Sequence, residues 1–130
     1  MISDRELFGP FKVEPYRSRA LLDLANGQRC VRCGKQTDGE TVGCHLHGKY
    51  SHLFSKGGSQ KSDDFMIFFG CFYCHQLFDS EDLAGGNWNS EDEKALEFFV
   101  LVCRTWRLLI HQKKLVLAIN KRPRTLEAMP

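Results

Sequence analysis

Two Cys-x-x-Cys pairs constrain the fold of this chain more than any other feature. The first pair is Cys30 and Cys33, and the second pair is Cys71 and Cys74. Four thiolates form the soft, tetrahedral ligand set that selects zinc. A single pair would also suit a redox motif, but two pairs in one small chain favour a metal. The sequence therefore predicts a core that is held together by a structural Zn²⁺ ion.

The length of 130 residues predicts one domain. Six cysteines would also suit a secreted disulfide framework, but residues 1–6 are charged and no apolar signal segment follows them. No uncharged run reaches the ~20 residues that a membrane-crossing helix needs. We expect a cytoplasmic protein without a membrane partner, and in a reducing compartment paired cysteines indicate metal binding.

The charge is distributed unevenly along the chain. The net charge of +2 divides into +4 over residues 1–61, −8 over residues 62–97 and +6 over residues 98–130. Basic flanks around an acidic centre suit a protein that grips a phosphate backbone near a divalent cation. Ordinary solvated surface charge explains the same pattern equally well.

The predicted elements follow the chain in a simple order. An extended arm over residues 1–16 precedes a core over residues 17–79, which holds a helix over 17–25, strands over 41–46 and 65–69, and a helix over 71–78. Residues 80–88 form a loop. A long helix over residues 90–112 follows, with Ser90 as its N-cap and Glu93 reaching back in a capping box. Residues 114–119 suit an edge strand, and residues 121–130 form a basic tail.

The long helix carries a line of apolar residues at helical spacing. This line comprises Leu96, Phe99, Val100, Cys103, Trp106 (or Arg107) and Ile110. Two alternatives follow: the line packs on the core, or it pairs with a second subunit in a homodimer. We expect Cys44 and Cys103 to be ordinary buried thiols. Trp88, in a Gly/Asn loop, is the one aromatic that we expect to make surface contacts.

The insert between the cysteine pairs contains several residues that suit metal-dependent chemistry. It begins with Cys44-His45-Leu46-His47, continues with His52 and Asp64, and ends where His75 follows the last cysteine. Phosphodiester cleavage needs a cation on the scissile phosphate and a general base that activates water. An imidazole suits the base because its ordinary pKa lies near neutral pH.

From Arg17 to Asp79, the chain resembles the YbcO family of phage and prophage nucleases, within the HNH or His-Me finger superfamily. The matching elements are the two cysteine pairs, the strand that ends in His45, His52, a Lys/Gly loop with Lys56, Gly57 and Lys61, and then Asp64, His75 and Asp79. The resemblance implies an α+β fold with a zinc-stabilised, treble-clef-like ββα-metal core and a long C-terminal helix.

The resemblance also implies roles for particular residues. His45 would be the general base, and Asp64 with His75 would hold a catalytic Mg²⁺ or Mn²⁺, with Asp79, His47 or His52 as further ligands. Apart from the resemblance, Lys49, Lys56 and Lys61 suit either contact with a phosphate backbone or an ordinary solvated surface, and Arg104 and Arg107 are further candidates for DNA contact. Cys44 departs from the pattern, because many HNH enzymes place Asp or His directly before the base, and a thiol is ill-suited to Mg²⁺.

The function expected from the resemblance is endonucleolytic hydrolysis of DNA in phage recombination or DNA processing, in the cytoplasm of a bacterial host. Expected partners are DNA and host or phage recombination proteins. One alternative is a zinc module that binds nucleic acid without cleaving it. Another is a phage protein that inhibits a host factor, with its acidic middle segment mimicking nucleic acid.

Overall fold

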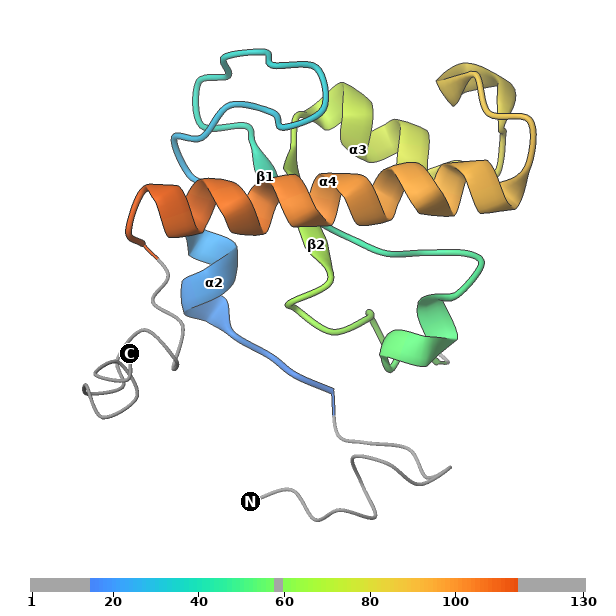
Figure 1. The fold of residues 1–130 in the computed structure, drawn as a ribbon, viewed down its shortest axis with the longest axis horizontal. Helices are drawn as coiled ribbons and strands as arrows, with labels where there is room; N and C mark the ends of the chain where they lie inside the picture. The colour runs from blue at the N-terminus through green and yellow to red at the C-terminus, as the bar shows by residue number, and fades with distance from the viewer. Residues whose placement is uncertain (1–14, 58–59, 115–130) are drawn as a thin grey trace, which may run out of the picture.

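The computed structural model describes residues 15–57 and 60–114. Most of the N-terminal arm, the edge strand expected beyond residue 114 and the basic tail lie outside the described residues. The protein is a small α+β structure with a two-stranded sheet and a long C-terminal helix (Figure 1). None of the helices in the described part of the chain combines the length and apolarity needed to cross a bilayer.

The sheet is an antiparallel pair of short strands, as the sequence predicts. Strand β1 spans Val42–His45 and β2 spans Ile67–Gly70, and their register pairs Val42 with Gly70 and His45 with Ile67. All four residues of β2 are buried because β2 lies between β1 and the C-terminal helix. β1 is therefore the free edge of the sheet, and His45 stands at its end.

Short helices flank the hairpin. They are α2 (Arg19–Asp23), α3 (Phe72–Asp79) and the 3₁₀ turns η1 (Ser51–Phe54) and η2 (Ala84–Gly86). Helix α2 approaches β1 at Gly43, where an added Cβ would lie 3.0 Å from Ile67 Cδ1 and 3.2 Å from Leu22 Cδ2. Glycine at this position lets α2 pack directly beside the strand that carries His45.

Helix α4 spans Glu91–His111, and its start confirms the predicted N-cap. The Ser90 hydroxyl accepts a hydrogen bond from the Glu93 amide at 3.2 Å. The Glu93 carboxylate accepts from the amide of Asn89 at 3.0 Å, one residue further back than in a standard capping box. The first bond satisfies an amide of the first helical turn that has no intrahelical partner, and the second ties the residue before the N-cap to that turn.

The predicted apolar line meets the core only at Phe99 and Trp106, which are partly buried and pack against it. The residues that α4 buries are Lys94, Ala95, Phe98, Leu101, Val102, Thr105 and Leu109. Leu96, Val100, Cys103 and Ile110 are exposed instead. Apolar residues occur on nearly every side of this helix, so periodicity does not select one face. Small side chains at Ala95 and Thr105 suit the side that faces β2, and the Thr105 hydroxyl accepts from the Phe69 amide at 3.1 Å.

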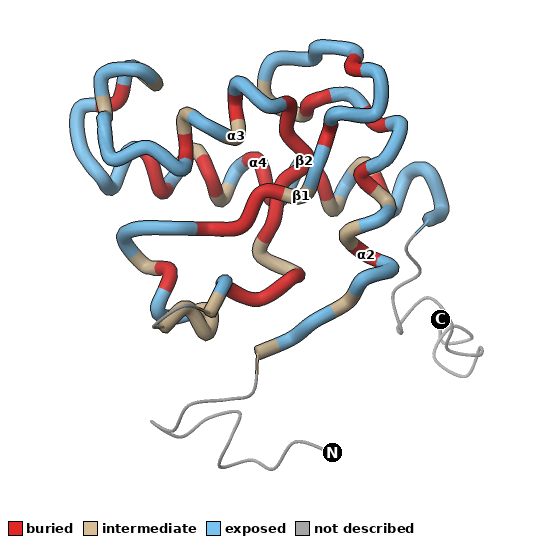
Figure 2. The backbone as a smooth tube through the Cα atoms, turned by 180° about the vertical axis from the view of Figure 1, so that it is seen from behind, coloured by how far each residue is buried: buried red, intermediate tan, exposed pale blue. Residues whose placement is uncertain are grey.

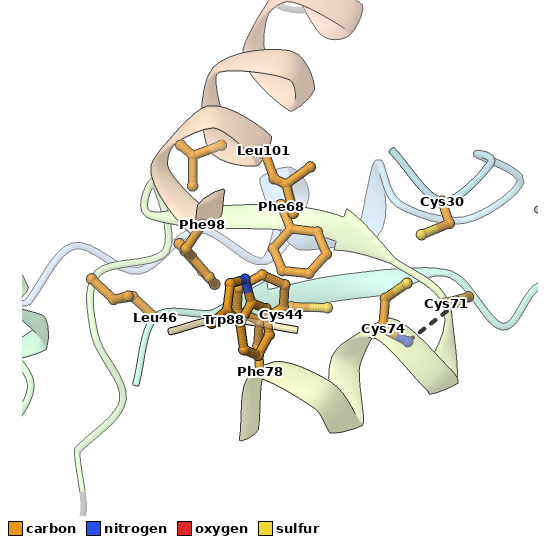
Figure 3. Packing of buried hydrophobic residues seen from close by; sticks show 11 residues of the cluster. Cys30, Cys44, Leu46, Phe68, Cys71, Cys74, Phe78, Trp88, Phe98 and Leu101 are labelled. Atoms are coloured by element: carbon orange, nitrogen blue, oxygen red, sulfur yellow. Dashed lines mark hydrogen bonds between the residues drawn. The ribbon is translucent and has the colours of Figure 1, made fainter. Parts of the chain in front are cut away.

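The core is an aromatic cluster between the sheet, α3 and α4 (Figure 3). Phe68 packs edge-on against Phe78 and against Phe98, with ring centroids 5.2 Å apart in each pair. Trp88 lies over Phe78 at 4.8 Å and is buried, so the surface role predicted for it is wrong. Its indole nitrogen donates to Glu97 at 2.8 Å, which satisfies its only polar atom.

Candidate metal centre and active site

The four cysteines of the two pairs converge into one cluster. Their sulfur atoms all lie within 4.8 Å of one another, and the Cys33 and Cys71 sulfurs are 3.8 Å apart. Zn–S bonds of about 2.3 Å in a tetrahedron would separate the sulfurs by about 3.8 Å. The cluster can therefore hold a metal ion and is consistent with the structural zinc that the sequence predicts.

The backbone around the cluster favours thiolates. The Cys33 amide points at the Cys30 sulfur and the Cys74 amide at the Cys71 sulfur, each at 3.5 Å (Figure 3). Burial raises the pKa of Cys30, but hydrogen bonds from neighbouring amides outweigh burial and lower the pKa to about 7. Cys71 is also the N-cap of α3, where the helix end favours negative charge. A lowered thiol pKa favours metal binding because the bound form is the thiolate. Burial instead raises the pKa of Cys33 and of Cys74, so this preference for the thiolate holds at Cys30 and does not extend over the whole cluster.

Arg32 links the cysteine cluster to α4. Its Nη1 lies 3.7 Å from the Cys74 sulfur, and its Nε donates to the Glu97 carboxylate at 2.8 Å. A guanidinium beside the cluster offsets the negative charge that four thiolates and a divalent ion carry together. The same residue thus ties the first cysteine pair, α3 and α4 into one unit.

A cavity of about 520 Å³ lies beside the cysteine cluster, between α2, β1 and α3. Four histidine or carboxylate side chains that the sequence singles out line it, namely His45, His47, His75 and Asp79. Arg19 and Lys61 supply positive charge to the same wall. Helix α4 contributes none of the lining residues. The cavity therefore brings a histidine base candidate together with metal-ligand candidates and cations.

His45 is held by a buried carboxylate. Its Nε2 lies 2.8 Å from Oδ1 of Asp64, and the two residues are 8% and 3% exposed. Because a carboxylate only accepts, Nε2 carries the hydrogen and Nδ1 keeps its lone pair. Burial lowers the pKa of His45, and the bond to Asp64 offsets only part of that effect. The residue is therefore a neutral, oriented imidazole, which is the form that a general base needs.

Asp64 is clamped by the segment before α2. Its Oδ2 accepts from the Ser18 amide at 2.7 Å, and Arg17 lies 3.4 Å from its Oδ1. Burial raises the pKa of Asp64, but the bonds from His45 and Ser18 outweigh burial and lower it. Asp64 does not line the cavity that holds His75. The structure thus places this residue behind His45 and away from His75, with which the sequence pairs it.

Asp79 takes the place beside His75 that the sequence assigns to Asp64. The two residues are one turn apart on α3, and Asp79 Oδ2 lies 3.1 Å from His75 Nε2. Its other oxygen lies 3.3 Å from His47 Nε2. Each of the three side chains is more than a third exposed, and all three line the cavity. The i, i+4 spacing of His75 and Asp79 on α3 is the signal in the sequence that indicates their proximity.

The cysteine cluster is the more convergent of the two ligand sets. Among the residues that the structure describes, it is the only group of three or more His, Cys, Asp or Glu side chains with ligand atoms that all lie within 4.8 Å of one another. Asp79 bridges the imidazoles of His47 and His75, but the ligand atoms of these three residues do not all lie within 4.8 Å of one another. The second set is therefore a looser arrangement around a single carboxylate.

The two remaining cysteines differ in burial. Cys44 is fully buried in the aromatic core, as predicted, and burial raises the pKa of its thiol well above the ordinary value (Figure 3). It is a neutral thiol that stays out of the cavity lining. The expectation that Cys103 is buried is wrong, because the residue lies on the exposed side of α4.

The basic residues expected to contact DNA occupy different parts of the surface. Lys61 lines the cavity. Lys49 instead forms an ion pair with Asp92 at 2.7 Å. Arg104 donates to the Val31 carbonyl at 3.3 Å and Arg107 is exposed, both on α4. Lys56 lies close enough to His47 to lower the pKa of that histidine, a minor effect beside burial. His52 is exposed on η1 and does not line the cavity.

Comparisons with protein-family models, curated proteins and solved structures give no match for this chain. What the site can do therefore follows from its own residues. These are a cysteine cluster that can hold a metal ion, an oriented neutral histidine, and a carboxylate with two histidines in a cavity that also presents cations.

Proposed function

We propose that this protein is a metal-dependent DNA endonuclease of the HNH type. The observation that carries the proposal is that His45, backed by the buried Asp64, lines the same cavity as His75 and Asp79. The order of the elements supports it, because an antiparallel hairpin leads directly into α3, the helix that carries His75 and Asp79. This ββα order and the residues around it are those of the YbcO-like pattern in the sequence.

In this proposal His45 activates the attacking water. Nδ1 of the neutral imidazole accepts a proton from water as the oxygen attacks phosphorus, and Asp64 stabilises the imidazolium that forms. Asp64 keeps the ring in this orientation because its carboxylate is fixed by the Ser18 amide. The cavity cations Arg19 and Lys61 pair with the phosphate backbone and hold it in place.

The cation of the reaction is assigned to His75 and Asp79. The Asp79 carboxylate suits Mg²⁺ or Mn²⁺, the His75 imidazole on the same face of the helix favours a transition metal, and Asp79 has no lysine or arginine partner among the described residues. When bound, such an ion supplies Lewis-acid stabilisation of charge on the phosphate and leaving oxygen. The structural zinc fixes the start of α3 and with it the direction of His75, the residue after Cys74.

A second candidate is a zinc module that binds nucleic acid without cleaving it. Two observations favour this alternative. Cys44 occupies the position directly before the base and is a buried neutral thiol. The ligand atoms around Asp79 also converge less closely than the four sulfurs do. In this alternative the protein contacts DNA in the same way but does not hydrolyse it.

The deciding experiment is cleavage of supercoiled plasmid and of branched DNA with Mg²⁺ or Mn²⁺ by wild type and His45→Ala. We expect wild type to cleave and His45→Ala to lose about 10²- to 10⁴-fold in rate. The matched control is His52→Ala, which removes an exposed histidine outside the cavity and should cleave like wild type. Zinc content and melting temperature of each variant should match wild type. DNA binding without cleavage under every cation tested would support the second candidate instead.

A further inference from the structure

Helix α4 presents a regular apolar stripe to solvent. Leu96, Val100 and Ile110 are 64%, 44% and 38% exposed, and Cys103 and Arg107 are exposed between them. The spacing alternates between four and three residues, which is the heptad spacing of helices that pair side by side. Leu96, Val100, Cys103 and Ile110 belong to the line that sequence periodicity singles out, and they lie on the side of α4 opposite β2, whereas Phe99 and Trp106 of that line pack against the core.

No described segment covers this stripe. The core uses the other side of α4, through Phe98, Leu101 and Leu109. An exposed row of large apolar residues over four helical turns is uncommon on a monomer and typically marks an interaction site. Single exposed apolar residues need no explanation, but a row at heptad spacing on a straight 21-residue helix has the form of a helix-pairing surface (Figure 1).

The charges along α4 indicate what pairs with it. The first half, residues 91–102, contains four carboxylates, Glu91, Asp92, Glu93 and Glu97, and one lysine. The second half and the turn that follows it, residues 103–114, contain Arg104, Arg107, Lys113 and Lys114 and no carboxylate. The helix dipole favours this distribution within one helix. It also makes the helix complementary to a reversed copy of itself, and a parallel copy would place like charges together.

We propose that the exposed stripe of α4 pairs with the same stripe of a second copy of this chain, antiparallel, around a two-fold axis near Cys103. Leu96 and Ile110 each lie seven residues from Cys103, so the axis places Leu96 of one copy against Ile110 of the other. The same axis sets the acidic first half of each helix against the basic second half of the other. The two Cys103 side chains meet at the centre.

This pairing leaves the catalytic cavity open. The cavity lies between α2, β1 and α3, and no residue of α4 lines it. Helix α4 packs against β2 and runs behind the two strands in the view of Figure 2. Each copy therefore keeps its own accessible site. The dimer stands independently of the proposed nuclease activity, because none of the residues that carry it lines the cavity.

Sedimentation velocity of the full-length, zinc-loaded protein over a wide concentration range tests the pairing. We expect a dimer, and we expect Leu96→Glu to raise its dissociation constant roughly tenfold or more, because it places a charge where Leu96 would pack against Ile110 of the other copy. The control is Leu53→Glu, which places the same charge at a leucine of η1 that is 65% exposed. It should leave the dimer unchanged.

Cross-linking with a short bis-maleimide tests the orientation. Wild type should form a covalent dimer and Cys103→Ser should not, which separates Cys103 from the thiols of the metal site. Wild type that remains monomeric at all concentrations overturns the proposal. A dimer that is insensitive to Leu96→Glu, or equally sensitive to Leu53→Glu, overturns it, as does a dimer that Cys103 does not link.

Discussion

Nε2 of His45 lies 2.8 Å from Oδ1 of Asp64, and both side chains are buried. The two residues are distant in sequence and meet because His45 ends β1 and Asp64 lies just before β2. The far oxygen of Asp64 accepts from the Ser18 amide at 2.7 Å. A carboxylate held in this way can only accept from His45, and this fixes the tautomer of the imidazole.

Asp64→Asn should reduce cleavage about 10²- to 10⁴-fold without loss of zinc. An asparagine amide that donates to Nε2 moves the hydrogen to Nδ1 and removes the lone pair that accepts the proton of water. Single-turnover cleavage with Mg²⁺ or Mn²⁺ measures the effect. Asp63→Asn is the matched control, since Asp63 is buried next to it and bonds the Tyr16 amide. Equal losses in both variants would point to misfolding of this loop and would contradict the orienting role of Asp64.

The same pair should make stability fall toward acidic pH. Burial keeps the pKa of His45 below its ordinary value of 6.5, so below that pH the unfolded chain binds a proton that the folded chain resists. The lowered pKa of Asp64 acts in the same direction below its ordinary value of 3.8, and its contribution is lost as the pH falls through the folded pKa. Stability therefore rises with pH in both windows.

Urea denaturation from neutral pH down to about pH 5 isolates the histidine window. We expect the free energy of unfolding to decrease over this range and His45→Gln to flatten the decrease. His52→Gln, at an exposed position, should follow wild type. The zinc content is measured at each pH, because protonation of the thiolates also releases metal. A slope that is unchanged in His45→Gln would show that another group carries the pH dependence.

Local patterns in the sequence predict most of the elements of this fold. The cysteine pairs, both strands, α3 and the Ser90 N-cap lie where local spacing and capping signals place them. The buried face of α4 does not follow from such signals, because the helix is apolar on several sides. Contact with β2 selects the face that carries Phe98 and Leu101, and because the residues of that face also recur at helical spacing, spacing alone does not choose between the two faces.

The candidate site follows from the sequence only in part. His45 and His75 line one cavity because the cysteine cluster and the hairpin bring β1 and α3 together. The position of the Asp64 carboxylate depends on its contacts with Arg17 and Ser18, which are more than forty residues away in sequence. No local motif records that contact. Asp79 and His75 lie one turn apart on α3, so their sequence spacing alone predicts that they are close.

Metal removal should unfold much of the protein. Two cysteine pairs hold residues 30–33 against α3, and zinc binding to such sites contributes about 10–16 kcal/mol in small zinc domains. A strong chelator or Cys74→Ser should abolish cooperative thermal unfolding followed by circular dichroism. Cys103→Ser is the control, as it removes an exposed thiol outside the cluster. Replacement by Co²⁺ should give the thiolate charge-transfer absorption of a four-sulfur site. Unchanged melting of metal-free protein would contradict a structural role for the ion.

The aromatic core should be sensitive at Phe68. Its side chain is fully buried between Phe78 and Phe98, so Phe68→Ala leaves a cavity and should cost about 3–5 kcal/mol of unfolding free energy. Phe72→Ala is the matched control, because Phe72 is 63% exposed on α3 and its loss should change stability by about 0.5 kcal/mol or less. Urea denaturation of both variants measures the difference, and similar losses would contradict the packing described.

Lys61 should contribute to DNA binding more than the arginines of α4 do. It lines the cavity with His45 and Asp79, and α4 contributes no residue to that cavity among the residues that the structure describes. Lys61→Ala should weaken binding across sequences and reduce the slope of log K against log salt by about 1, the effect of losing one phosphate contact. Arg104→Ala should leave both unchanged, because its guanidinium bonds the Val31 carbonyl. Fluorescence anisotropy at several salt concentrations measures both quantities. A larger loss at Arg104 would place the DNA on the α4 side of the molecule and would contradict the assignment of the cavity as the DNA site.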